Sequence, residues 1–245
     1  MEKNPYRYRI KITVDILNEV INLYLTTEIK REDVVEIVKR IYEKYGLKPI
    51  KGKSTPMDIY DKELSSLYII GKYGLGLDTE YPDLFNKVFS IEKKLEECIN
   101  LLISNKYSEA RELLKTINPL NIVDSNTLAR MLRIPFIKLI FGFISENDFS
   151  NILMKTIEAF PEETRTIKSF VKFYIAFKIS DMIYRGLIRD KSYKEAYKKA
   201  LALRIGFSRT VPDDQYVYSI AREVFNIPED VLNNILTVNF EKKRE

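Results

Sequence analysis

Residues 31–46, REDVVEIVKRIYEKYG, decide the fold class of this chain. Their apolar side chains recur every three or four residues, which places them on one face of a helix. Acidic residues stand at the start of the stretch and a lysine stands near its end, as the helix dipole favours. We therefore predict an amphipathic helix over about 31–45, ending at Gly46 in the left-handed conformation common at helix C-termini.

The same periodicity continues along nearly the whole chain. We expect helices at about 8–25, 31–45, 58–73, 82–104, 107–117, 125–133, 135–144 and 146–159, from Pro161 onward, and at 192–204, 212–226 and 228–238. With 8 glycines and 9 prolines in 245 residues, the chain has too few turn residues for an all-β protein. These patterns predict an all-α, multi-helical protein of about ten helices in antiparallel hairpins, an irregular bundle with no sheet.

Two further features concern helix ends and domains. The tetrapeptide KYGL occurs at 44–47 and again at 72–75, so we expect a second left-handed C-cap at Gly74, with Leu75 packing back on its helix. A soft boundary near Asp78–Pro82 would separate an N-terminal subdomain, 1–78, from a C-terminal domain, 79–245. One continuous domain is the alternative.

The connection between the second and third expected helices contains IKGKSTP, residues 50–56, which resembles the end of a phosphate-binding P-loop. That motif needs a glycine at position 47, where this chain has Leu47. Pro49 would also remove one backbone N–H from the phosphate cradle, and a helix rather than a strand precedes the loop. The segment is therefore a helix connection and not a P-loop.

The composition excludes several kinds of catalytic site. The chain has no histidine, which removes Ser-His-Asp and Cys-His nucleophilic sites and ordinary zinc sites. Its single cysteine, Cys98, lies on the apolar side of an expected helix, so we predict an inert buried thiol. Any catalysis would depend on Asp, Glu, Lys or Tyr, or on a cation held by carboxylates.

The sequence also indicates a cytoplasmic protein with no membrane partner. A single cysteine fits a reducing compartment, and the charged first 15 residues lack the apolar core of an export signal. The longest apolar run, residues 134–144, is much shorter than the ~20 residues of a membrane span, and Lys138 interrupts it.

Positive charge gathers late in the chain. The net charge is +5, but Lys and Arg outnumber Asp and Glu by 12 to 5 over residues 161–211, a local excess typical of nucleic-acid binders. Lys191, Lys194 and Lys198 line one flank of an expected helix, where they could follow a phosphate backbone. A solvated lysine-rich face is the alternative. The candidate contacts are Lys48, Lys51, Lys53, Arg185, Arg189, Lys191, Lys194, Lys198, Lys199, Arg204 and Arg209.

One carboxylate pattern is compatible with a metal site. Glu32, Asp33 and Glu36, followed by Asp58 and Asp61, approximate the acidic pattern of all-α nucleotide pyrophosphohydrolases, which hold Mg²⁺. All of them fall in the first turns of expected helices, where acidic residues already serve as caps and complement the helix dipole. We therefore assign no metal ligand, no catalytic residue and no cofactor.

Residues 40–77, RIYEKYGLKPIKGKSTPMDIYDKELSSLYIIGKYGLGL, resemble the N-terminal part of an archaeal family, domain of unknown function 2192. The agreement is clearest in the KPIKGKSTPMDIYDKELSSLY and GKYGLGL segments. The resemblance implies an archaeal source and no mechanism. The abundance of Lys and Glu also suits a thermophile.

The leading hypothesis is a non-enzymatic helical protein whose basic face at 185–209 contacts RNA, DNA or a ribonucleoprotein. The first alternative is a helical protein–protein interaction module. The second is a Mg²⁺-dependent all-α nucleotide pyrophosphohydrolase.

Overall fold

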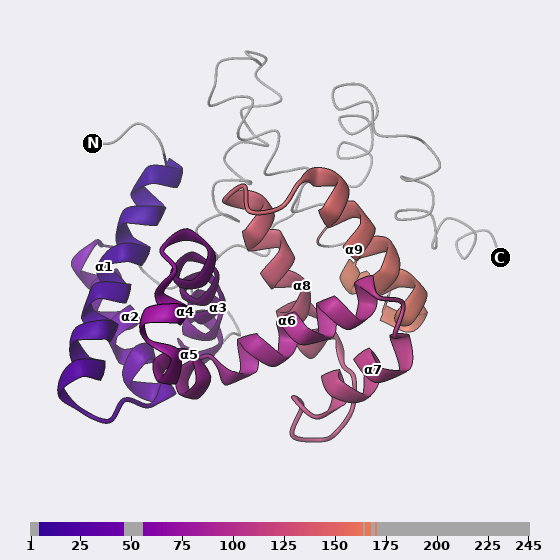
Figure 1. Cartoon of the computed structure of the whole chain (residues 1–245), viewed down its shortest axis with the longest axis horizontal. Coiled ribbons are helices and arrows are strands. Elements are labelled where there is room, and N and C mark those ends of the chain that lie inside the picture. The colour runs from indigo at the N-terminus through magenta and orange to yellow at the C-terminus, as the bar shows by residue number, and fades with distance from the viewer. Residues whose placement is uncertain (1–4, 47–55, 164, 168–169, 171–245) are drawn as a thin grey trace, which may run out of the picture.

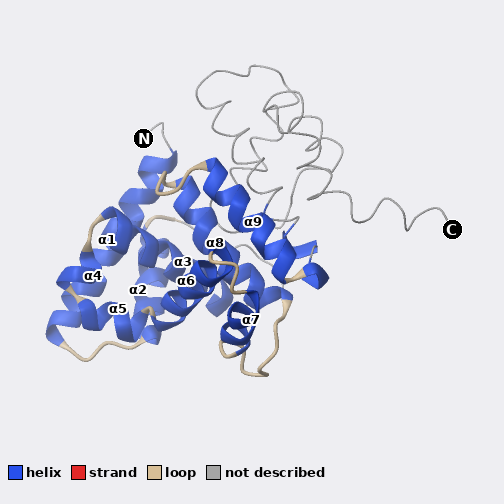
Figure 2. Ribbon diagram, turned by 45° about the vertical axis from the view of Figure 1, so that its right-hand side comes forward, coloured by secondary structure: helices blue, strands red, loops and turns tan. Residues whose placement is uncertain are grey.

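The computed structural model describes residues 5–46, 56–163, 165–167 and 170 (Figure 1). Those residues form α1 (Pro5–Thr26), α2 (Arg31–Lys44), α3 (Pro56–Ile69), a π-helical turn η1 (Ile70–Gly74), α4 (Leu77–Glu80), α5 (Pro82–Val88), α6 (Ser90–Ile103), α7 (Tyr107–Lys115), α8 (Ser125–Ile140), α9 (Glu146–Ala159) and a short 3₁₀ turn η2 (Pro161–Glu163). Within these ranges there is no strand, so the all-α prediction is confirmed (Figure 2).

The helices pack in two groups that α6 connects (Figure 1). On one side α1 packs on α2, and α2 packs on α3; on the other, α6 contacts α7, α8 and α9. Helix α3 also packs against α8, so the apolar core continues from one group to the other. The division into two domains near Asp78–Pro82, where α4 meets α5, stays a prediction.

Helix α2 shows how the sequence pattern becomes structure. All six of its periodic apolar residues are buried, and the Asp33 carboxylate accepts a hydrogen bond from the backbone N–H of Lys30 at 2.7 Å. This bond satisfies a donor that the first helical turn leaves unpaired. Gly46 has a φ of +67°, so the predicted left-handed C-cap is confirmed.

The prediction of a second such cap at Gly74 is wrong. Helix α3 instead widens into the π turn η1, where the N–H of Leu75 donates to the carbonyl of Ile70 at 3.1 Å. The wide turn satisfies that carbonyl without a left-handed residue, and the positive φ falls two residues later, at Gly76 (+66°). Leu75 does not pack back on the helix, since it is 48% exposed.

The prediction also failed at Pro135, which we expected to separate two helices. We expected separate helices at 125–133 and 135–144, but α8 runs through Pro135 without a break as far as Ile140. Proline costs a helix one backbone hydrogen bond, to the residue four positions earlier, here Met131. Both Met131 and Pro135 are buried in the core, and this packing outweighs the lost bond. Conversely, the helix expected over 82–104 is divided at Phe89 into α5 and α6.

The thiol of Cys98 is inert, as predicted. Its side chain is fully buried, its Sγ donates to the carbonyl oxygen of Ala110 at 3.2 Å, and burial raises its pKa to about 12. Among the described helices, none is long and apolar enough to span a lipid bilayer.

Candidate functional site

The predicted basic face lies outside the described residues. Each of the eleven candidate contacts, in 48–53 and 185–209, belongs to a part of the chain that the structure does not describe. The basic face therefore stays a prediction from the sequence.

The structure describes only some of the carboxylates on which the metal hypothesis depends. Asp33, the third residue of α2, accepts from the backbone N–H of the N-cap residue Lys30, and Glu32 and Glu36 are not buried. Asp58 and Asp61 belong to the first turns of α3, but their side chains are not described. Within the part of the chain that is described, no three His, Cys, Asp or Glu side chains are arranged to hold a metal ion. The pyrophosphohydrolase alternative stays a prediction.

Helix α6 carries two buried glutamates. Glu92 is 0% exposed and Glu96 is 6% exposed, and they stand one helical turn apart. The i, i+4 spacing puts both carboxylates on the face that carries the apolar core residues of this helix. A buried carboxylate is strongly unfavourable unless charged or hydrogen-bonding partners compensate it.

Glu92 is compensated by one arginine. Arg31, the first residue of α2, donates from Nη1 to Oε2 of Glu92 at 3.0 Å and from Nη2 to Oε1 at 3.1 Å. The same guanidinium donates to the backbone carbonyl of Val88, at the end of α5, at 3.3 Å. This two-pronged pair has no net charge and ties the start of α2 to the α5–α6 junction.

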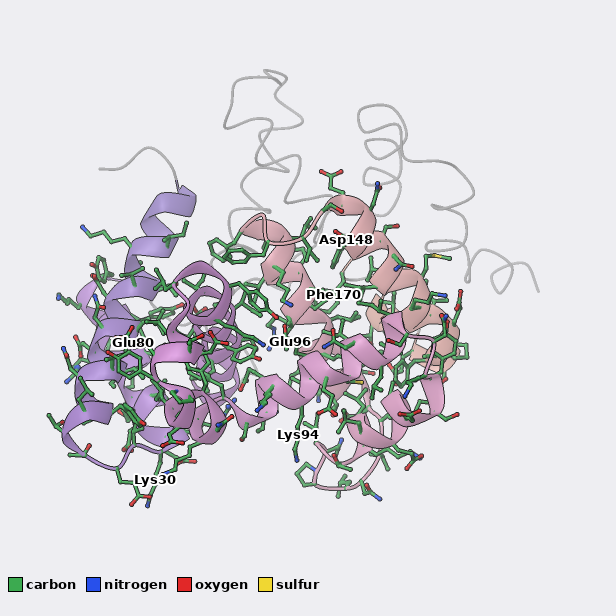
Figure 3. The ribbon with its side chains drawn as sticks, in the orientation of Figure 1. Lys30, Glu80, Lys94, Glu96, Asp148 and Phe170 are labelled. Carbon is green, nitrogen blue, oxygen red and sulfur yellow. The ribbon has the colours of Figure 1, made fainter. Side chains whose placement is uncertain are left out.

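The buried charge of Glu96 is compensated by four hydrogen-bond donors, two on each carboxylate oxygen. Its Oε2 accepts from the hydroxyl of Tyr68 at 2.7 Å and from Nζ of Lys72 at 2.8 Å. Its Oε1 accepts from the hydroxyl of Tyr73 and from Nζ of Lys138. We call these five residues the Glu96 cluster. It lies near the middle of the described helices, where α6 passes α3 and α8 (Figure 3).

The π turn η1 helps to form this cluster. It carries Lys72 and Tyr73, and it lies so close to α5 that a Cβ on Gly71 would be 2.8 Å from Cζ of Phe85. Nζ of Lys138 lies 4.0 Å from the centre of the Tyr73 ring, and Nζ of Lys72 lies 5.1 Å from it. Both ammonium groups therefore interact with the same aromatic ring as well as with the same carboxylate.

The cluster fixes the protonation of its members. Burial opposes the charge of Glu96, but the hydrogen bonds from Lys138, Lys72, Tyr73 and Tyr68 outweigh it and lower the pKa of this carboxyl to about 2. Burial, followed by the hydrogen bond to Glu96, raises the pKa of both Tyr68 and Tyr73 above the usual value. At neutral pH, Glu96 is an anion and both tyrosines are neutral donors.

Comparison with known proteins agrees with the resemblance in residues 40–77. The family model described as an uncharacterized protein conserved in archaea, domain of unknown function 2192, matches residues 3–236. The chain belongs to this archaeal family. No curated protein and no solved structure matches the chain.

The family gives no activity, so the chemistry of the Glu96 cluster must be inferred from its geometry. An ionised carboxylate whose oxygens are all engaged is a poor base, and tyrosines with raised pKa values are poor nucleophiles. Two ammonium groups around one carboxylate instead leave an excess of one positive charge. This arrangement suits the recognition of an anion rather than catalysis.

The sequence analysis did not identify this cluster. Glu92 and Glu96 lie in a charged stretch, EKKLEE, and nothing in it separates buried glutamates from exposed ones. One signal was present: Lys138 interrupts the apolar run at 134–144, and a lysine inside a buried helix requires a partner. The partner, Glu96, stands 42 residues earlier and is identified only by the packing of α8 on α6.

Proposed function

We propose that this protein binds nucleic acid, alone or within a ribonucleoprotein, through the cations of residues 185–209. The observation that carries this proposal is the uneven distribution of charge between that segment and the described helices. The proposal assigns the protein to the cytoplasm of an archaeon, and the abundance of Lys and Glu favours a thermophilic one.

The described helices are not a basic surface. Residues 10–46 and 63–163 contain 17 Lys and Arg against 22 Asp and Glu. Many of those cations are already paired, since Arg31, Arg111 and Lys138 each form an ion pair with a glutamate. As a whole, this part of the chain carries more negative than positive charge, so it attracts a polyanion less than residues 185–209 do.

The segment 185–209 has the opposite composition. It contains eight Lys and Arg against two acidic residues, Asp190 and Glu195, so most of its cations have no acidic neighbour in sequence. A polyanion that binds such a segment releases condensed counterions, which is favourable and depends steeply on salt. Each phosphate that is neutralised contributes a slope of about −0.9 on duplex DNA and about −0.7 on a single strand in a plot of log affinity against log salt.

The test measures binding of labelled RNA and DNA to the full chain over a salt series. We expect binding that weakens linearly on the logarithmic plot, and a shallower slope in the triple variant Lys191→Glu, Lys194→Glu, Lys198→Glu. The matched control is Lys39→Glu, Lys44→Glu, Lys94→Glu, three exposed lysines of the described helices. No binding at low salt, or an equal loss in both triple variants, would overturn the proposal.

A helical protein-interaction module is the second candidate, and one observation favours it. The loop between α7 and α8 exposes 76% of Leu120 and 47% of Ile122, two apolar side chains that a protein partner could cover. A partner that stays bound after nuclease treatment and high salt, and is lost on Leu120→Glu, would support this function. Its persistence with Leu120→Glu would exclude the loop as its binding surface.

A further inference from the structure

We propose that Lys72 and Lys138 form a binding site for a phosphate group at the exposed edge of the Glu96 cluster. This site is separate from the basic segment 185–209 and belongs to the described helices. It would take phosphate as a free anion or as part of a nucleotide or a polynucleotide backbone.

The two lysines carry more positive charge than Glu96 neutralises. Lys72 and Lys138 both form their ion pairs with Glu96, so two positive charges share one negative charge. Asp78 is near enough to act on the Tyr73 hydroxyl, but within the described residues it forms an ion pair with neither lysine. A partly buried positive charge that is not neutralised is unfavourable, so an additional anion would be bound favourably here.

The two ammonium groups also have N–H donors that the cluster does not use. An ammonium group has three N–H bonds. Lys72 uses one for Oε2 of Glu96 and one, at 3.3 Å, for the hydroxyl oxygen of Tyr68, while Lys138 uses one for Oε1 of Glu96. The two ammonium groups are therefore held on adjacent oxygens of a single carboxylate. A group with several anionic oxygens, such as phosphate, can accept from both lysines at once.

Both lysines are accessible from the solvent. The side chain of Lys72 is 30% exposed and that of Lys138 is 16% exposed. Tyr73, whose ring lies beside both ammonium groups, is 40% exposed, whereas Glu96 itself is buried beneath them. An anion from the solvent therefore meets the lysines before it meets the carboxylate. Partial burial also strengthens the attraction relative to that of a fully hydrated lysine.

The backbone supports the same site. Lys72 and Tyr73 belong to the π turn η1, which continues α3 at its C-terminal end. The turn is fixed by the close approach of Gly71 to Phe85 and by the contact of Tyr73 with Phe143, whose ring centres are 6.0 Å apart. The two lysines are thus held in place before any ligand arrives.

Titration of the full-length protein with inorganic phosphate, at constant ionic strength, tests the proposal. We expect Lys72→Met and Lys138→Met each to weaken phosphate binding roughly tenfold, the usual effect of losing a charge-assisted hydrogen bond. The control is Lys94→Met, which removes an exposed lysine on the opposite side of the same helix as Glu96 and should leave affinity unchanged (Figure 3). Equal affinity in wild type and both folded methionine variants overturns the proposal.

A second variant keeps the test decisive if a methionine variant does not fold. Glu96→Gln removes the carboxylate that competes with phosphate for the two ammonium groups, so it should bind phosphate more tightly than wild type. Circular dichroism establishes which variants are folded, and the folded ones decide the outcome. Unchanged or weaker phosphate binding by folded Glu96→Gln counts against the site.

The source of the phosphate is resolved by two further ligands, a mononucleotide and a short single-stranded RNA. If Lys72→Met weakens mononucleotide binding only, the site takes a small ligand; if it also weakens RNA binding, the site takes the backbone. Failure of wild type to bind either RNA or DNA would remove the function proposed for residues 185–209. It would leave the phosphate comparison between wild type and Lys72→Met intact, so the two proposals fail separately.

Discussion

Two glutamates on one face of α6 are buried to nearly the same degree but are neutralised differently. Glu92 faces a single arginine that supplies two parallel hydrogen bonds, so the pair has no net charge. Glu96, one turn further along, faces two lysines and two tyrosines, so the Glu96 cluster has a net positive charge.

This difference is the reason why we propose a ligand site at Glu96 and none at Glu92. The guanidinium of Arg31 matches the carboxylate of Glu92 and also holds the end of α5, so that pair serves to join three helices. Lysine is a point charge with rotatable donors, and two lysines on one carboxylate keep donors to spare. The Arg31–Glu92 pair therefore serves to connect helices, whereas we propose that the Glu96 cluster also accepts an anion.

The largest expected effect on stability comes from breaking the ion pair between Arg31 and Glu92. Arg31→Met would leave the fully buried Glu92 carboxylate without a cation, and such losses destabilise a fold by about 3–5 kcal/mol. Urea unfolding of the variant should show this decrease in the free energy of unfolding. The control is Arg40→Met, which breaks the exposed pair with Glu19 and should cost less than about 1 kcal/mol. Similar decreases in the free energy of unfolding of the two variants would contradict the role of the Arg31–Glu92 pair in connecting the helices.

The next largest effect on stability is expected when the pH is lowered. Because hydrogen bonds lower the folded-state pKa of Glu96 to about 2, its ionised form stabilises the fold at pH values above its unfolded pKa of 4.5. This contribution, about 3 kcal/mol, should disappear as the pH falls from about 4.5 to about 2. Unfolding measured at several pH values should show Glu96→Gln converging with wild type over that interval. If the difference in stability between Glu96→Gln and wild type stays constant with pH, then the ionised form of Glu96 does not stabilise the fold.

The helices themselves were largely predictable from the sequence. In α2 and α9 the apolar periodicity and the acidic caps agree, and the predicted ranges differ little from the observed ones. The failures arose where tertiary packing overrides a local rule. Pro135 remains inside α8 because it is buried in the core, and Gly74 loses its expected cap because the helix before it widens into a π turn.

The Glu96 cluster could not be predicted for a different reason. Its members come from α3, η1, α6 and α8, and sequence spacing gives no information on contacts between residues 24 and 42 positions apart. A charge pattern indicates which residues are available to pair, but only the packing decides which ones do. The same limit applies to the basic segment 185–209, where the sequence shows an excess of charge and not its arrangement.

The smallest expected effect on stability comes from removing one of the two lysines. Lys72→Met leaves Glu96 with Lys138 and two tyrosine hydroxyls, so the carboxylate keeps a counter-charge and three donors. The lost hydrogen bond is partly offset by relief of the repulsion between the two ammonium groups, and we expect a decrease of about 1 kcal/mol or less in the free energy of unfolding. Urea unfolding beside the exposed-site control Lys94→Met measures this difference. If Lys72→Met costs as much as Arg31→Met, then Glu96 needs both lysines for neutralisation, and the excess positive charge on which the phosphate site depends does not exist.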